Sequence, residues 1–190
     1  MIIGYEICGY GNDSHMTGNW NKFLPEIKSI IPKCDNCGYR LDYKFINPYF
    51  KLNRKTLDFS STYDGVTIVS LKFKEFCNRY GYNNLEFTTL PGTPNFYGFA
   101  VIENTLPYNF ITKEKLCKKC GQYESIVGPT LNAANINEPL TDGFYQSDLW
   151  FASGNEKSPV LIIAPSTKAN FDKEKFKNIS FTKIEKNNIR

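Results

Sequence analysis

Histidine is almost absent from this sequence of 190 residues, which has a single one at position 15. The sequence also lacks the GxSxG and HExxH motifs and the phosphate-binding loop GxxxxGK[S/T]. His15 lies in the polar, glycine-rich segment 8–22, where we expect an irregular loop and a solvated imidazole. Four aspartates near predicted turns are expected to be solvated or to cap the backbone: Asp58, Asp64, Asp142 and Asp148. Because the sequence shows no convergent set of general acid, general base and nucleophile, we expect a protein that is not an enzyme.

Long hydrophobic runs are also missing. No apolar stretch approaches the length of about 20 residues that a membrane-spanning helix needs. The first residues, 1–4, have neither the basic segment nor the long apolar segment of a secretory signal. We therefore expect a soluble, cytoplasmic protein without a membrane partner.

Charge of one sign is not concentrated along the sequence, and the formal net charge is only +4. The densest groups of lysines are Lys72/Lys74, Lys115/Lys118/Lys119 and Lys173/Lys175/Lys177. Acidic or apolar residues alternate with them, which is typical of solvated faces and not of a phosphate-binding stripe. Nucleic acid is therefore the less favoured partner.

Aromatic residues, in contrast, are abundant: 12 Tyr and 15 Phe raise the aromatic share to 15%. Tyr and Phe favour pleated, half-buried surfaces, so this composition indicates a sheet-rich fold. The length suits one domain and is enough to bury a core. We predict a single mixed α/β (α+β) domain over residues 1–190.

The spacing of the cysteines is the most specific signal. The sequence CDNCG at 34–38 is matched by CKKCG at 117–121. Two cysteines separated by two residues can share a metal, and the following glycine can adopt the positive φ that closes the turn. Two such knuckles supply a complete tetrahedral shell for Zn²⁺. We predict one Zn²⁺ per chain, held by Cys34, Cys37, Cys117 and Cys120.

Other interpretations of these cysteines are weaker. A redox CxxC should begin a helix beside a strand, but turn-forming and strand-like residues flank both knuckles. Structural disulfides suit a secreted chain, and two unrelated reduced turns would require a coincidence. A shell of four thiolates leaves no position for a substrate, so the zinc would be structural. Cys8 and Cys77 should stay outside it, Cys77 as a core thiol.

Two segments, 66–90 and 159–184, share the predicted order strand, helix, strand. In the first, Ser70 is placed to cap a helix. An apolar stripe at helical spacing follows, formed by Phe73, Phe76, Cys77 and Tyr80. In the second, Ala169 and Phe176 lie on the predicted inner face of the helix. The pattern leaves open whether a duplication relates the two halves.

Three further predictions concern the rest of the chain. Residues 2–7 should form a first strand, and the alternation at 41–45 predicts another. Residues 122–147, rich in Asn, Pro and Gly, should form a long surface excursion.

Several parts of the sequence resemble one family: the two knuckles, the segment DGVTIVS at 64–70, and the segments SDLWF at 147–151 and PVLII at 159–163. It is the bacterial double-CXXCG family, grouped with immunity proteins of polymorphic and contact-dependent toxin systems. The resemblance covers roughly residues 30 to 185, and the knuckles are its specific part. It implies one metal bound by the knuckle cysteines, no catalytic residues, and a toxin protein as the partner.

Three functions agree with these features to different degrees. A zinc-stabilised immunity protein that neutralises a cognate toxin by protein–protein binding agrees best with a closed metal shell. The alternative is a nucleic-acid-binding, zinc-ribbon-like protein, but ribbon knuckles are usually separated by about 15–20 residues. Here a whole structural unit lies between them. A zinc-dependent hydrolase or deaminase ranks last, because it needs an open zinc position and a nearby Glu.

A few aromatic side chains often contribute much of the free energy of tight binding between proteins. We take as candidates for the partner-binding surface the aromatic residues expected in irregular stretches: Trp20, Phe96, Tyr97, Tyr145 and Trp150. Core packing is the alternative for each of them, because a sheet-rich fold must bury most of its aromatics.

Overall fold

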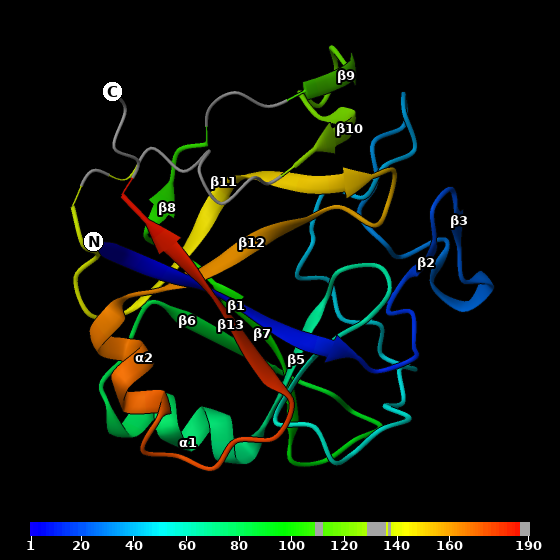
Figure 1. Cartoon of the computed structure of the whole chain (residues 1–190). Helices are drawn as coiled ribbons and strands as arrows, with labels where there is room; N and C mark the ends of the chain where they lie inside the picture. Colours follow the sequence, from blue (N-terminus) through cyan, green and yellow to red (C-terminus); the bar gives the residue numbers. More distant parts are fainter. Residues whose placement is uncertain (109–111, 129–135, 137, 187–190) are drawn as a thin grey trace.

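The computed structural model describes residues 1–108, 112–128, 136 and 138–186 (Figure 1). The strands of its main sheet are β1 (Ile2–Gly11), β4 (Phe59–Ser61), β5 (Thr67–Ser70), β6 (Leu85–Thr89), β7 (Phe96–Val101), β8 (Thr105–Leu106), β9 (Thr112–Leu116), β10 (Tyr123–Val127), β11 (Phe144–Ser153), β12 (Ser158–Ile163) and β13 (Ile179–Glu185). The helices are α1 (Leu71–Arg79), α2 (Pro165–Phe171) and the short 3-10 helix η1 (Pro25–Ile27).

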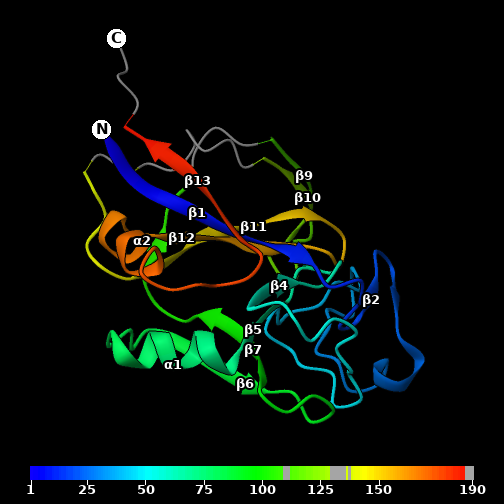
Figure 2. The same cartoon turned by 60° about the horizontal axis from the view of Figure 1, so that its bottom comes forward.

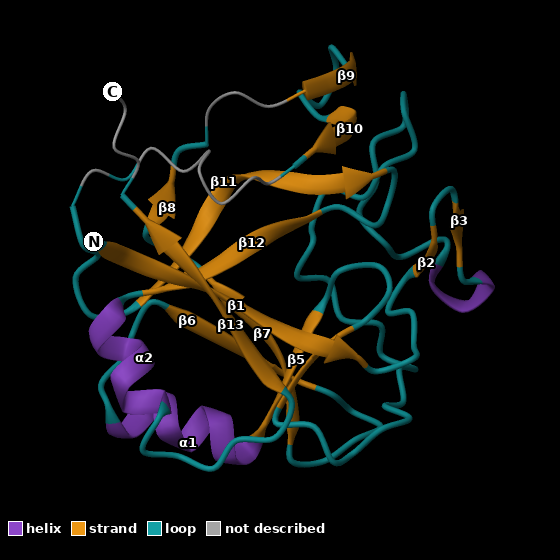
Figure 3. Ribbon diagram, viewed as in Figure 1, coloured by secondary structure: helices purple, strands orange, loops and turns teal. Residues whose placement is uncertain are grey.

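Within these described residues, eleven strands join in one sheet, in the order β6–β7–β5–β4–β1–β12–β11–β10–β9. In addition, β13 pairs with β1, and β8 pairs with β11. A separate small ladder is formed by β2 (Gly18–Asn19) and β3 (Lys22–Phe23). The predicted sheet-rich, mixed α/β fold is confirmed (Figure 3).

Strand β1 connects the part of the sheet formed by β6, β7, β5 and β4 with the part formed by β12, β11, β10 and β9. Its first half pairs with β12 (Tyr5 opposite Ile163), and its last residues pair in parallel with β4 (Tyr10 opposite Ser60). The prediction of a loop from residue 8 is wrong, because the strand continues through Gly9. A Cβ at Gly9 would come within 2.6 Å of the carbonyl oxygen of Phe59. Glycine therefore permits a close approach of two backbones here, and it does not mark a turn.

The first strand–helix–strand segment is formed by β5, α1 and β6. The Ser70 hydroxyl accepts a hydrogen bond from the backbone N–H of Phe73 and so caps α1. Phe73, Phe76 and Cys77 are completely buried. Figure 2 shows α1 lying along β5, β6 and β7, while α2 lies next to β1.

In the second segment, β12 and β13 flank α2, but the predicted inner face of this helix is wrong. Ala169 is exposed, and the buried residues are Thr167 and Phe171. Phe176 lies beyond the end of the helix and packs from the following loop, with its ring centroid 5.3 Å from that of Phe171. The stripe was misplaced because the helix ends earlier than its apolar pattern suggests.

The core lies on both faces of the sheet. In β12, Leu161 and Ile163 belong to the cluster that packs under both helices, whereas Val160 and Ile162 belong to a cluster on the opposite face. This alternation follows from the two-residue repeat of a strand. A strand covered on both faces explains the uninterrupted apolar run of β12.

Two further predictions fail. Residues 41–45 form turns instead of a strand, because the Asp42 carboxylate accepts a hydrogen bond from the backbone N–H of Lys44 and bends the chain. Residues 122–147 do not form one long surface excursion, because they contain β10 and the start of β11. Within this range, residues 129–135 and 137 lie outside the described part.

Candidate metal centre

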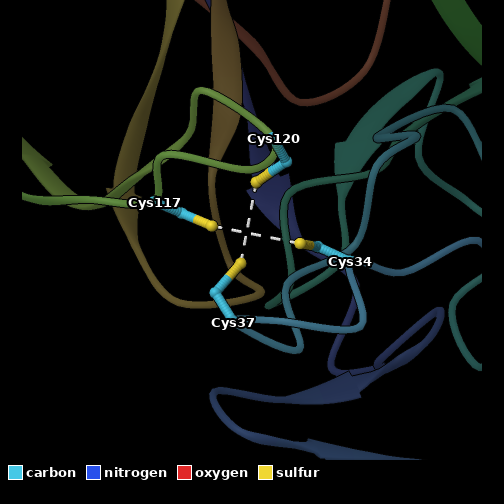
Figure 4. A group of neighbouring side chains, drawn as sticks. All are labelled: Cys34, Cys37, Cys117 and Cys120. Atoms are coloured by element: carbon cyan, nitrogen blue, oxygen red, sulfur yellow. Dashed lines mark hydrogen bonds between the residues drawn. The ribbon is translucent and has the colours of Figure 1, made fainter.

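The four knuckle cysteines come together in space (Figure 4). Their sulfur atoms all lie within 4.8 Å of one another. The Sγ atoms of Cys34 and Cys117 are 4.0 Å apart, and those of Cys37 and Cys120 are 3.7 Å apart. These separations far exceed the S–S bond of about 2.05 Å in a disulfide. The cluster is compatible with a metal site formed equally by the two knuckles.

The two knuckles repeat the same backbone hydrogen bonds. The N–H of Cys34 donates to the carbonyl of Tyr39, and the N–H of Gly38 donates to the carbonyl of Cys34. The N–H groups of Cys117 and Gly121 make the corresponding bonds at 2.8 Å each. Gly38 and Gly121 have φ values of 77° and 74°. The local sequence CxxCG therefore fixes each turn, and the fold has only to bring the two turns together.

Hydrogen-bond donors surround the sulfurs. Backbone N–H groups of Cys37 and Asn36 lower the pKa of Cys34. The Asn36 side-chain amide donates to Cys117 Sγ at 3.4 Å and is the main reason why the pKa of Cys117 falls to about 6. Burial acts in the opposite direction and raises the pKa values of Cys37 and Cys120. A bound cation would favour the thiolate at all four positions, because a coordinating thiol is deprotonated.

Arg40 anchors the first knuckle to the rest of the fold. Its side chain is only 1% exposed, and its guanidinium donates to the carbonyls of Asp64 at 2.7 Å and Lys157 at 2.6 Å. Its backbone N–H donates to Asn155 Oδ1, and its carbonyl accepts from the amide of Gln122. Gln122 follows the second knuckle directly, so Arg40 ties both knuckles to the β11–β12 turn.

Lys157 places a buried positive charge beside the cluster. Its side chain is 3% exposed, and its ammonium donates to the carbonyl of Tyr123 and lies 4.6 Å from the ring centroid of Tyr39. Burial lowers the pKa of Lys157, while the sulfurs of Cys37 and Cys120 act against this shift. Sequence analysis missed both Arg40 and Lys157, because nothing in their local sequence distinguishes them from surface cations.

Both cysteines that were predicted to stay outside the cluster do so. Cys77 is completely buried in the aromatic core, and the thiol of Cys8 points to Glu6 Oε1 at 3.4 Å. His15 is also not a member of the cluster. It is half-buried and not solvated as predicted, because its ring packs 5.1 Å from that of Tyr63.

The four turn aspartates accept hydrogen bonds from other segments. Asp64 is fully buried, and its carboxylate accepts from the backbone N–H groups of Met16 and Thr17. This contact orders part of the segment that was predicted to be an irregular loop. The remaining three bind hydroxyl or backbone donors, as capping residues do: Asp58 with Ser70, Asp142 with Thr167, and Asp148 with Tyr108.

The aromatic partner-binding candidates have different surroundings. Trp20 is 40% exposed and remains available at the surface. Tyr145 is buried, at 9% exposure, and its hydroxyl donates to the carbonyl of Thr141. The prediction of an exposed Tyr145 is therefore wrong, because Tyr145 lies in β11 on a covered face of the sheet and not in an irregular stretch.

The other three candidates are half-buried and also lie in strands, Phe96 and Tyr97 in β7 and Trp150 in β11. The ammonium of Lys74 lies 4.2 Å from the ring centroid of Tyr97. Trp150 packs edge-on against Tyr43 and lines a cavity of about 330 Å³ next to the second knuckle.

No protein-family model matches the sequence, and a search of curated proteins found no match either. Among the residues that the structure describes, no helix is long and apolar enough to cross a membrane.

Proposed function

We propose that this chain is a non-catalytic binding protein stabilised by one structural Zn²⁺, and that it is an immunity protein which neutralises a cognate bacterial toxin by binding it. The four-sulfur cluster between two equivalent knuckles is the observation that carries the proposal. The resemblance of the knuckles and the segments around them to the double-CXXCG family supports the choice of partner.

The geometry of the cluster agrees with zinc. With Zn–S bonds of about 2.3 Å, a regular tetrahedron has sulfur–sulfur edges of about 3.8 Å. The separations of 3.7 Å and 4.0 Å between sulfurs of opposite knuckles lie close to this value. Thiolates are soft ligands, and a tetrahedral set of four suits zinc. In this proposal Cys34, Cys37, Cys117 and Cys120 are the four ligands.

A zinc bound by four thiolates has no position for water or a substrate. Its contribution is then to stability, because it closes a long loop between two stretches that are distant in the sequence. The sheet positions the second knuckle, which lies at the turn between β9 and β10, and the hydrogen bonds of Arg40 hold the first knuckle beside it. A rigid surface around the knuckles is suited to protein binding, because little conformational entropy is lost when a partner docks.

The proposed function is tested by co-expression with toxin genes encoded beside the gene of this protein. We expect the wild-type chain to restore growth and to form a stable complex with one such toxin on size exclusion. A Cys37→Ser/Cys120→Ser variant should lose both effects, and Cys8→Ser should retain them. Failure of the wild-type chain to rescue growth with any neighbouring toxin would contradict the proposal. A catalytic activity that disappears with one side chain would also contradict it.

A further inference from the structure

The fold gathers four lysines around one cavity of about 390 Å³. Lys55 comes from the loop before β4, Lys72 from the first turn of α1, and Lys175 and Lys177 from the loop between α2 and β13. We call this site the basic pocket. Along the sequence, Lys72 and the pair Lys175/Lys177 belong to two separate groups that resemble solvated faces, and Lys55 belongs to no such group. Their convergence is visible only in the folded chain.

The positive charge of the basic pocket is not balanced. Within the described residues, none of its four lysines forms an ion pair with a carboxylate. Asp58 lines the same cavity, but its carboxylate accepts from the Ser70 hydroxyl at 2.7 Å and from the backbone N–H of Lys177 at 2.8 Å. Four like charges around one carboxylate repel one another, and such a surface attracts anionic groups.

The Lys72 ammonium is held in place. It donates to the carbonyl of Lys175 at 2.6 Å and lies 4.7 Å from the ring centroid of Phe176. The other three lysines of the basic pocket, Lys55, Lys175 and Lys177, are exposed residues.

Part of the lining is apolar. Leu57 is buried and Phe96 is half-buried, and both line the same cavity as the lysines. Phe96 is also one of the aromatic residues that sequence analysis selected as partner-binding candidates. Lysines and apolar side chains around one cavity fit a segment that carries carboxylates on either side of an apolar side chain. A cavity of this size holds only a few side chains.

We infer that the basic pocket docks an acidic segment of the partner protein, with carboxylates on its lysines and an apolar side chain against Phe96. This inference rests on the proposed function, which supplies the partner. A single-stranded nucleic acid would instead need a positively charged groove that follows its backbone over several nucleotides. The lysines converge on one cavity, so an acidic protein segment fits the arrangement better.

The probe for the test is the fluorescein-labelled peptide EDEFEDE, with the amide peptide QNQFQNQ as the uncharged control. Both are titrated by fluorescence anisotropy at low ionic strength, where surface electrostatics is least screened. We expect the acidic peptide to bind and the amide peptide to bind at least about tenfold more weakly, because its charges are missing. Lys55→Glu/Lys177→Glu should weaken binding of the acidic peptide to a similar extent.

The matched control is Lys22→Glu/Lys28→Glu, which changes the net charge equally at exposed residues outside the basic pocket. It should retain binding of the acidic peptide within about twofold. Equal binding of both peptides, or equal loss in both variants, would overturn the inference. An oligothymidylate of equal charge serves as the phosphate probe. If it binds more tightly than the acidic peptide, and if only Lys55→Glu/Lys177→Glu loses this binding, the inference is overturned and the pocket is assigned to phosphate groups.

The toxin complex separates this inference from the proposed function. Unchanged affinity of Lys55→Glu/Lys177→Glu for a toxin that the wild-type chain neutralises would overturn the docking inference alone. Absence of any neutralised toxin would overturn the proposed function, whereas the peptide titration, which needs no toxin, would still decide whether the basic pocket binds an acidic segment. Thermal melts of both double variants establish that each has folded.

Discussion

The sulfur atoms of Cys37 and Cys120 lie 3.7 Å apart, although 83 positions separate these residues in the chain. One of them ends a turn in the loop between β3 and β4, and the other ends the turn between β9 and β10. All five residues of β9 are exposed, and β10 is its partner in the sheet. Ile126 of β10 belongs to the core cluster on one face of the sheet, so hydrophobic packing holds β10. The position of β9 therefore depends on its pairing with β10 and on the cysteine cluster.

Removal of the proposed zinc should loosen this region first. With a zinc chelator under reducing conditions, we expect the melting temperature to fall and amide exchange to become faster in residues 33–40 and in β9 and β10. Exchange around Phe73 should change little, because none of the four knuckle cysteines belongs to the aromatic core cluster. Addition of Zn²⁺ should restore protection. Uniform faster exchange across the whole sheet would contradict this localised role.

The glycines of the knuckles test the turn geometry. Gly38→Ala and Gly121→Ala should each lower the free energy of unfolding by about 1 kcal/mol or more, because an alanine is strained at positive φ. A Cβ at either position would meet nothing within 4 Å, so the cost is conformational and not steric. Gly11→Ala is the control, since its Cβ would lie 3.9 Å from Tyr63 and its φ lies outside the positive range. Urea unfolding of the three variants measures the difference, and equal effects would refute the explanation.

Lys157→Met should weaken metal binding while the fold is retained. The methionine fills a similar volume but removes the positive charge beside two of the four sulfurs. Outer-shell partners of metal sites commonly contribute 10–100-fold in affinity, so we expect a loss of about tenfold in a chelator competition. Lys113→Met is the matched control, because that ammonium is exposed and lies 5.5 Å from the ring centroid of Tyr123. Equal zinc affinity of the two variants would exclude a role for Lys157.

The aromatic core should depend strongly on Phe73. Its ring lies within 5.3 to 6.4 Å, centroid to centroid, of six phenylalanines: Phe59, Phe76, Phe99, Phe144, Phe171 and Phe176. Phe73→Ala should lower the free energy of unfolding by about 3–5 kcal/mol, whereas Tyr49→Ala, at an exposed residue, should change it by less than about 0.5 kcal/mol. Denaturant unfolding compares the two. A loss below about 1 kcal/mol for Phe73→Ala would show that the core repacks around the gap.

Sequence patterns predicted those features whose cause is local. A CxxCG turn needs only its own cysteines and glycine, and the cap and apolar stripe of α1 need only residues 70–80. The four-cysteine cluster followed from the repetition of one local motif. The strand expected at 41–45 failed because a local contact from Asp42 competes with the alternating pattern.

Features that depend on distant segments could not be predicted in this way. Arg40 is buried because carbonyls of Asp64 and Lys157 surround its guanidinium, and the sequence pattern did not place these three residues together. The basic pocket was missed for the same reason, since its lysines come from three segments. Tyr145 was misplaced because its burial is decided by which face of β11 is covered.

The metal content of the purified protein tests the central claim most directly. Protein prepared without chelator is examined by elemental analysis and by X-ray absorption at the zinc edge. The account predicts one zinc per chain with four sulfur neighbours at about 2.3 Å. Cys8→Ser should give the same result, because the Cys8 thiol lies outside the cluster. Protein free of zinc, or zinc with nitrogen or oxygen among its nearest neighbours, would contradict the account.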